Sequence, residues 1–400
     1  MLLSLPVDRY PPLHYSPQKQ KEQTLEALVH QVTVLARQQP VLLVFEDVHW
    51  VDPTTQELLD LLVPRVLQMR VLLLVTYRPE YLPHWSGASH VTALGLNRLN
   101  RRLGAELAGQ VTGGRALPAE VLEQIMARTD GVPLFVEELT KTVLESGIVR
   151  LGAQGYELTG PLTSFAIPAT LQDSLMARLD RFSEVREVAQ IGSCIGREFP
   201  HELLSAVAGM PSDKLQAVLG QLADAELIFR RGTPPDALYT FKHALVQDAA
   251  YASLLKSRRQ VLHRIIAEAL EAGFPERVAN EPEIVAQHYS AAGLLDAAVA
   301  YWLVAGLRAI GRFANAEAIG HLGNGLKSLG SLPEGVERDR KELSLQANLG
   351  TALGNSRGYA PPEVGYAFER ARELCGHVGE MAQMFPILWG LFNYYLMRAE

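Results

Sequence analysis

The sequence is short of cysteine, of basic charge and of long hydrophobic runs. Its two cysteines, Cys194 and Cys375, are far apart in the 400-residue chain, so they form neither a disulfide framework nor a metal motif. The longest apolar runs are about as long as a strand, whereas a membrane span needs roughly 18 apolar residues. A formal net charge of −7 argues against a large nucleic-acid surface. We therefore expect a cytoplasmic protein with free thiols, no membrane span and no nucleic-acid partner.

A strand–helix–strand pattern is predicted near the N-terminus. PVLLVF (40–45) and VLLLVTYR (71–78) are short apolar runs rich in branched residues, which is typical of strands buried on both faces. Between them, Asp52 and Pro53 predict the start of a helix, because Asp can cap free amides and Pro is tolerated at the first position. We expect a βαβ unit with parallel strands, preceded by a helix over residues 21–37.

The rest of the chain is predicted to be mostly helical. Residues 97–148 have helical spacing with breaks at Gly113-Gly114 and at residues 130–133, and a short strand is expected at 90–94. Residues 150–167 indicate a linker or a short hairpin. About four helices, then LIFRR and ALYTF around GTPPD, are typical of a winged helix. From His243 onward, small residues at helix-pair spacing favour a TPR-like solenoid.

Two carboxylates and a guanidinium follow the predicted strands. Glu46 and Asp47 come at the carboxyl end of the first strand, and Arg78 comes at the end of the second. Ligands of open parallel sheets bind at this edge. One carboxylate can hold Mg²⁺ through water, the other can orient an attacking water, and the arginine can contact a γ-phosphate. The plainer alternative is that these charges are only solvated strand ends.

At these residues the chain resembles a known family. PVLLVFEDVHWVDPTTQELL resembles the Walker B segment of STAND-class ATPases, which belong to the AAA-related P-loop NTPases and occur beside class III nucleotide cyclase domains. LLLVTYRPE resembles their sensor-1 strand, and DGVPLFVEELTKTVLESG resembles the GxP segment of their helical lid. IPATLQDSLMARLDR, QIGSCIGREF, YTFKHALVQDAAYASLL and RRQVLHRIIAEALE also match. The resemblance covers roughly residues 20–400.

The resemblance implies a nucleotide site. It implies that Asp47 orients the attacking water and that Glu46 is the magnesium-side carboxylate, although the Glu-Asp order leaves this division open. It implies nucleotide contacts for Arg78, and for Gly131 and Pro133 of the GxP segment. His243 is implied as a reader of the β-phosphate, but a helix cap or an interdomain contact explains that histidine equally well.

The phosphate loop of such an ATPase is missing. GxxxxGK[ST] has no match before residue 44. GHLGNGLKS (320–328) has one residue too many and is expected to be a packing helix. Without the loop's amides and lysine, the strand ends have little grip on ATP. The chain is then either part of a longer reading frame or a decayed paralogue, and the uncapped last helix (384–400) favours a fragment.

The sequence therefore predicts the α/β remnant of a P-loop NTPase core, a mostly helical winged-helix-like domain and a TPR-like solenoid. The expected function is that of a fragment of a signal-transduction STAND ATPase, with an output such as an upstream cyclase domain and protein partners on the repeats. Mg²⁺ and ATP or ADP are expected in the complete protein, none of them held tightly by this chain. The alternatives are a nucleotide-independent interaction module and a fragment of a maltose-activator-type transcription regulator. The expected domains are residues 1–96 (α/β core), 97–160 (lid), 161–245 (winged helix) and 246–400 (repeats).

Overall fold

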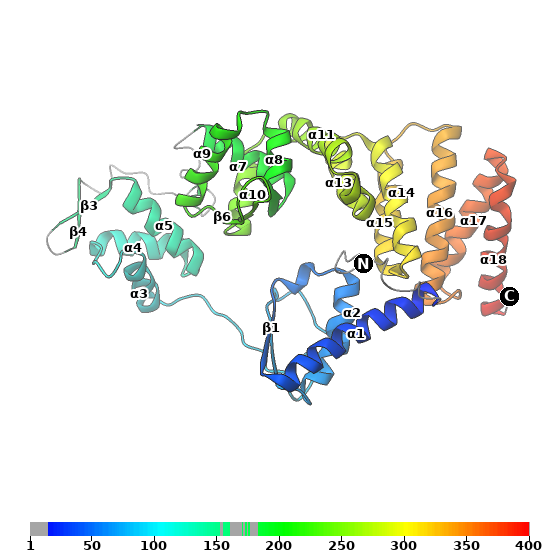
Figure 1. The fold of residues 1–400 in the computed structure, drawn as a ribbon, viewed down its shortest axis with the longest axis horizontal. Helices are drawn as coiled ribbons and strands as arrows, with labels where there is room; N and C mark the ends of the chain where they lie inside the picture. Colours follow the sequence, from blue (N-terminus) through cyan, green and yellow to red (C-terminus); the bar gives the residue numbers. More distant parts are fainter. Residues whose placement is uncertain are drawn as a thin grey trace. The chain divides into compact units, whose positions relative to one another are not determined.

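The computed structural model describes residues 15–152, 155–160, 170, 173, 175–176 and 183–399. It is mostly helical with a small parallel sheet, as predicted (Figure 1). The chain divides into two compact units, each considered by itself. The first comprises residues 1–94, 276–290 and 294–400, and the second comprises residues 95–275 and 291–293. Among the described helices, none has the length and hydropathy needed to cross a bilayer. IPATLQDSLMARLDR (167–181) falls mostly outside the described residues.

The first unit contains the predicted βαβ element. Its parts are α1 (Pro17–Gln38), β1 (Val41–Phe45), the short 3-10 turn η1 (Val48–Trp50), α2 (Pro53–Val66) and β2 (Val71–Val75). The Asp52 carboxylate caps α2 by accepting from the Thr55 amide at 2.9 Å, which confirms the predicted helix start. β1 and β2 pair in parallel, with Val41 opposite Val71 and Phe45 opposite Val75.

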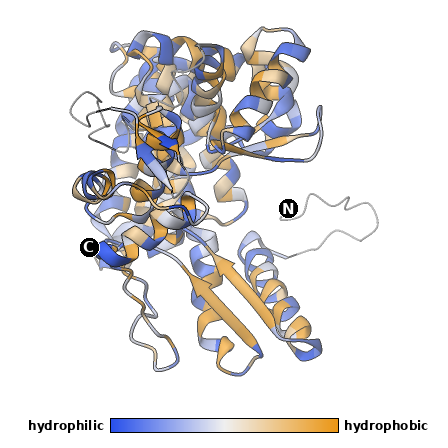
Figure 2. Ribbon diagram, turned by 90° about the vertical axis from the view of Figure 1, so that its left-hand side faces the viewer, coloured by the Kyte–Doolittle hydropathy of each residue, from blue (hydrophilic) through white to orange (hydrophobic). Residues whose placement is uncertain are grey.

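The prediction that these strands are buried on both faces is wrong. Successive side chains of a strand point to opposite faces. In β1 and β2 one set is half-buried against the side where α1 and α2 make contact. The other set is exposed and consists of Leu42 (61%), Val44, Leu72 (67%) and Leu74. Figure 2 shows both strands hydrophobic along their length. The exposed fractions show that this apolar face lacks a cover within the described residues.

The short strand expected at residues 90–94 is also absent. That segment has no regular structure, and His90 Nε2 contacts the Val63 carbonyl oxygen at 2.9 Å instead of joining the sheet. Within the described part of the chain, β1 and β2 therefore form a sheet of two strands, each with one unpaired edge.

The helical region predicted after residue 243 is confirmed. In the first unit, consecutive helices from α14 to α18 pack against one another in a stack. Small residues permit the close approach, because a Cβ on Gly325 would meet Leu345 at 2.8 Å and one on Gly350 would meet Phe368 at 2.9 Å. Residues 320–328 are helical, as predicted. The helices are α12 (Pro275–Asn280), α13 (Pro282–Ala292), α14 (Leu295–Gly311), α15 (Asn315–Leu329), α16 (Val336–Arg357), α17 (Pro362–Val378) and α18 (Met384–Arg398), with a 3-10 turn η3 (Met381–Gln383).

The second unit begins with a small helical domain, which we call the lid. It consists of α3 (Arg101–Val111), α4 (Ala119–Thr129), α5 (Pro133–Glu145) and a hairpin of β3 (Val149–Leu151) with β4 (Tyr156–Leu158). The helix breaks predicted at 113–114 and 130–133 are confirmed, and the hairpin occupies part of the predicted linker. An apolar core made of lid residues holds the helices together, with Ile125, Val136 and Leu139 fully buried.

The winged domain follows in the same unit. Its elements are α7 (Ser183–Ile195), β5 (Glu198–Pro200), α8 (His201–Ala208), α9 (Ser212–Asp224), β6 (Ile228–Arg231), β7 (Leu238–Phe241), α10 (Ala244–Ala252) and α11 (Lys256–Gly273). The strands form an antiparallel sheet in the order β5-β7-β6, and β5 is an addition to the predicted hairpin. The Phe199 ring packs on Tyr239 and Phe241 with centroids 5.7 and 5.3 Å apart. Cys194 and Cys375 are both free, as predicted, and both are buried.

Candidate functional site

The predicted strand-end residues are brought together by hydrogen bonds between the ends of β1 and β2. The Thr76 amide donates to the Phe45 carbonyl at 2.9 Å, and the Thr76 hydroxyl accepts from the Asp47 amide at 3.0 Å. The Val48 amide donates to the Thr76 carbonyl at 2.9 Å. These bonds hold Glu46 and Asp47 at the carboxyl edge of the parallel pair. We call Glu46, Asp47 and Arg78 the strand-end rim.

The backbone of the rim turns sharply at Asp47. Its φ of 54° and ψ of 41° lie in the left-handed region, which Asp tolerates better than most residues. The turn leads directly into η1, which carries His49 and Trp50. The Arg78 guanidinium lies over the Trp50 ring, 5.3 Å from its centroid, a distance suited to a cation–π contact. The aromatic ring therefore places the arginine on the same edge as the acidic pair.

A magnesium ion and a nucleotide fit this rim only in part. Mg²⁺ is commonly held by one or two carboxylates together with waters and substrate phosphates, and Glu46 and Asp47 could supply the carboxylates. Within the described residues, no group of three metal-ligating side chains exists. The amides that could grip phosphate are not offered by α2, because the Asp52 carboxylate already occupies its N-terminus. Among the described residues, the rim thus offers two carboxylates that could take part in holding Mg²⁺, and the N-terminus of α2 offers no free amides for phosphate.

A buried histidine beside the rim has unmet hydrogen-bonding capacity. Both ring nitrogens of His49 are buried, and neither has a partner among the described residues. The ring lies 4.7 Å from the Trp50 ring, centroid to centroid. Buried polar atoms are nearly always paired in folded proteins. A water molecule or another polar group is therefore expected beside the His49 ring.

In the second unit, Gly131 and Pro133 form the turn between α4 and α5. Pro133 opens α5 at a position where proline is favoured. Gly131 has φ +70°, and a Cβ there would come within 2.1 Å of the Leu99 carbonyl oxygen. The Leu99 amide donates to the Gly131 carbonyl at 2.7 Å. Backbone packing alone therefore requires glycine at this position.

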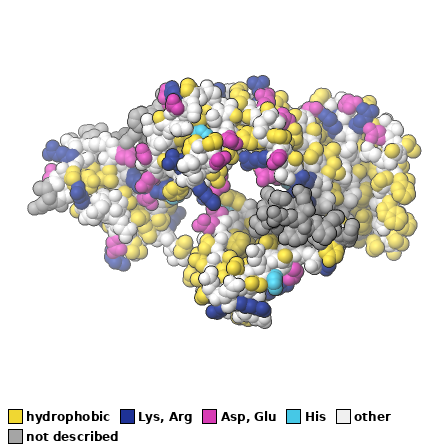
Figure 3. All heavy atoms as spheres, viewed as in Figure 1, with side chains coloured by type: hydrophobic (Ala, Val, Ile, Leu, Met, Phe, Trp, Pro, Cys, Tyr) yellow, Lys and Arg dark blue, Asp and Glu magenta, His cyan; other side chains and the backbone are white. Residues whose placement is uncertain are grey.

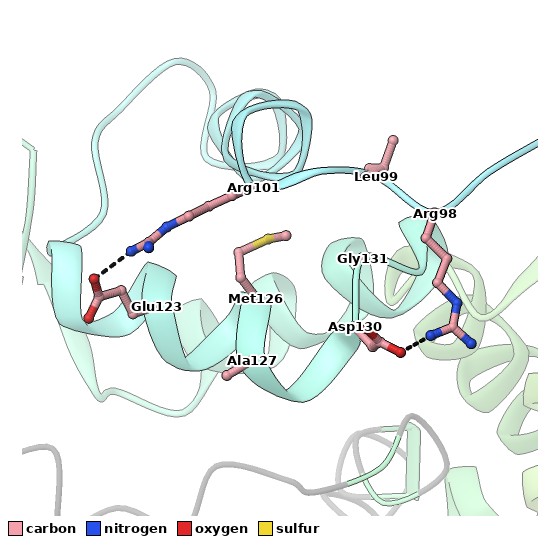
Figure 4. Close-up of a pocket in the computed structure, with 8 residues that line it drawn as sticks. All are labelled: Arg98, Leu99, Arg101, Glu123, Met126, Ala127, Asp130 and Gly131. Atoms are coloured by element: carbon pink, nitrogen blue, oxygen red, sulfur yellow. Dashed lines mark hydrogen bonds and ion pairs between the residues drawn. The ribbon is translucent and has the colours of Figure 1, made fainter.

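Gly131 also lines an open cleft of about 590 Å³ in the lid (Figure 4). The edge of the cleft carries two arginines, and each is turned toward a carboxylate. Arg98 points toward Asp130, and Arg101 points toward Glu123. The other lining residues are Leu99, Met126 and Ala127. The cleft thus combines apolar side chains with arginine–carboxylate pairs at its edge. Pro133 does not line it.

His243 lies at the end of β7, in front of α10. It occupies the cap position of that helix, but its side chain makes no capping hydrogen bond. Its Nε2 atom is buried without a partner among the described residues. Burial lowers the pKa of His243, nearby Glu138 and Glu137 raise it, and Lys242 and Lys141 lower it. The histidine therefore adjoins a charged cluster shared with α5 of the lid.

Sequence reasoning missed several residues that the structure places beside the predicted ones. Thr76 ties the strand ends together, and its position at the end of the second apolar run was the available signal. Lys141 of α5 contacts both Glu138 of the same helix and Glu226 after α9, and Glu226 also binds Lys242. No local pattern links these positions, because they are up to a hundred residues apart.

No family model matches the chain. It is 28% identical over 383 residues to an uncharacterised protein of Rhizobium meliloti (strain 1021), in an alignment that covers 94% of this chain and 36% of that protein. The chain thus spans little more than a third of this curated relative. Among solved structures, it is similar to a STAND protein with a tetratricopeptide repeat sensor from Pyrococcus horikoshii. That match has a TM-score of 0.40 and 12% identity, over 95% of this chain and 62% of the other.

Proposed function

We propose that the chain is the carboxyl-side part of a STAND-class signal-transduction ATPase. The observation that supports it is the strand-end rim, where Thr76 holds the acidic pair at the carboxyl edge of two parallel strands beside Arg78. Nucleotides bind at this edge in open α/β sheets. Acidic and basic groups that converge there suit phosphoryl transfer better than any other chemistry in the described residues.

Each rim residue has one task in this proposal. The half-buried Asp47 orients the attacking water and accepts its proton, while the exposed Glu46 holds Mg²⁺ through water. Arg78, braced by Trp50, contacts the γ-phosphate. The metal ion, when bound, would neutralise charge on the phosphates. In the second unit, Gly131 and Pro133 would contact the base, and His243 would read the β-phosphate.

The chain by itself is proposed to lack ATPase activity. The rim has carboxylates and a guanidinium but no amide cradle for phosphates. The exposed apolar face of β1 and β2 supports the proposal, because sheets of this class are covered on both faces. We propose that a further polypeptide segment carries the phosphate loop and completes the sheet. The helical repeats would bind a protein partner, and an effector such as a cyclase would give the output.

The test is Asp47→Asn in the full reading frame that contains this chain. Loss of the base should lower the turnover number for ATP by about 10²- to 10⁴-fold, while the affinity for nucleotide is retained. Asp52→Asn is the matched control, because it makes the same change five residues away and asparagine also caps helices. Equal turnover in wild type and Asp47→Asn would refute the role of Asp47.

A second candidate, a nucleotide-independent interaction module, is favoured by α18. This helix exposes a row of large apolar side chains along one side, visible at the right-hand end of Figure 3. Exposed apolar patches of this kind mark protein interaction sites. The row consists of Phe385, Leu388, Trp389, Phe392 and Leu396.

The row is symmetric about one point of α18. Phe385 and Leu396 lie at equal sequence distances on either side of this point, and so do Trp389 and Phe392. A second copy of α18 could therefore pair with the first in antiparallel register. Sedimentation velocity across a concentration series would test this. Self-association that is lost in Trp389→Ser and is indifferent to ADP would favour the second candidate. A monomer at every concentration would count against it.

A further inference from the structure

The lid and the winged domain meet through charges in the second unit. Lys141 of α5 reaches out of the lid, and its Nζ lies 2.7 Å from Oε2 of Glu226 in the winged domain. Lys242 at the end of β7 binds the same Glu226 oxygen at 2.8 Å. Lys242 Nζ also lies 3.8 Å from Oε1 of Glu137 on α5. We call these four residues, with Glu138, the ion-pair junction.

Glu226 has an unusual backbone for a charged residue. It follows α9 with φ 55°, and its amide donates to the Ala223 carbonyl at 2.9 Å. This left-handed position after a helix is normally filled by glycine or asparagine, because other side chains are strained there. Glutamate lacks the conformational freedom of glycine at this position. Its carboxylate nevertheless binds one lysine of the lid and one lysine of the winged domain. A strained residue with such contacts points to a function rather than to local folding.

The lysine side of the junction is anchored in the lid. The Lys141 side chain is only 17% exposed and also binds Oε1 of Glu137 at 2.8 Å. Its Nζ is 3.6 Å from Oε1 of Glu138, whose side chain is almost fully buried. By contrast, the apolar core of the lid is built from lid residues only, among those described. Polar contacts of this kind can open and reclose without exposing an apolar core.

We propose that the ion-pair junction is a reversible latch that fastens the lid helix α5 to the winged domain through Glu226. With the latch closed, the lid and the winged domain move as one body. His243 directly follows Lys242, so a movement of this histidine would be transmitted to α5. The latch is inferred from contacts within the second unit, and it does not depend on the proposed ATPase function.

The test is a distance measurement between spin labels at Gln124→Cys on α4 and Glu202→Cys on α8, both exposed positions. The native thiols should stay unlabelled, since both are buried and burial raises the pKa of Cys194 to about 12 and also that of Cys375. The full chain at low salt should give a single narrow distance. Glu226→Gln should abolish the single narrow distance. Salt at 1 M should also abolish it, because it shortens the Debye screening length to roughly 3 Å.

Glu226→Gly separates the latch from a structural role. It relieves the strained backbone, so the winged domain should melt at the same or a higher temperature, and yet the narrow distance should be lost. Glu184→Gln is the matched control, because it removes an exposed carboxylate that pairs with Lys214 inside the winged domain. A narrow distance in both Glu226 variants, or a broad one in the unmodified chain at low salt, would overturn the proposal.

Discussion

Two of the described sheets, β1-β2 and β5-β7-β6, both carry large apolar side chains but have opposite surroundings. In β5-β7-β6, the aromatic residues Phe199, Tyr239 and Phe241 are fully buried under the helices of the winged domain. In β1-β2, alternate leucines and a valine face outward. A winged domain closes its own core, whereas an α/β sheet needs helices on both faces. Among the described residues, the winged domain therefore closes its own core, whereas the rim lies on a sheet with one apolar face exposed.

The largest effect on stability is expected in the β5-β7-β6 sheet of the winged domain. Phe241→Ala should lower the local free energy of unfolding by about 3–5 kcal/mol, because it leaves a cavity under β7. Hydrogen exchange of the β6 and β7 amides would measure the change. Phe229→Ala is the control on the neighbouring strand, since Phe229 is exposed, and it should have little effect. Equal losses in the two variants would mean that the buried cluster does not stabilise this sheet.

The next effect concerns the buried charge of the lid. Lys141→Gln removes the ion pair that Lys141 makes with the buried Glu138 and should destabilise α5 by about 3 kcal/mol. Hydrogen exchange of the α5 amides is the readout. Lys214→Gln, at an exposed ion pair, should change stability by less than about 1 kcal/mol. If Lys141→Gln behaves like this control, Glu138 is neutralised by other groups.

The junction should also depend on pH. Hydrogen bonds from Lys141 and Lys242 lower the pKa of Glu226 from 4.5 to about 2. A carboxylate with a lowered pKa stabilises the folded state above its unfolded pKa. The stabilisation is thus complete at neutral pH and is lost as the pH falls from about 4.5 toward 2. Since Glu226 is more than half exposed, the effect should be small.

Melting temperature of the winged domain across this pH range would measure that contribution. Glu226→Gln should remove the part of the slope that lies between these pH values. An identical slope in wild type and Glu226→Gln would show that Glu226 has no lowered pKa in solution.

The smallest effect on stability is expected in the β1-β2 sheet. Leu72→Ala, at a side chain that is 67% exposed, should change stability by no more than about 0.5 kcal/mol in this chain. The same substitution in the full reading frame should cost about 2–5 kcal/mol, because the proposed covering segment would bury it. Hydrogen exchange of the β2 amides in both forms would compare them. Equal costs in the two forms would mean that the face stays exposed.

Local signals made much of the fold predictable. Asp52-Pro53 marked the start of α2, and the Gly and Pro punctuation at 113–114 and 130–133 marked the ends of the lid helices. Burial was not predictable, because a continuous apolar run such as PVLLVF is the same whether one face or both are covered. The pattern of the sequence put Glu46, Asp47 and Arg78 on one edge. The Lys141–Glu226 contact could not be predicted, because it depends on tertiary packing.

The most direct test of the central claim is equilibrium binding of Mg-ATP and ADP to the 400-residue chain, with Arg78→Ala measured in parallel. Because the rim lacks an amide cradle, we predict no saturable binding up to about 1 mM nucleotide for either protein. Binding at micromolar concentrations that is lost in Arg78→Ala would contradict the account. It would show that the strand-end rim holds a nucleotide without a phosphate loop.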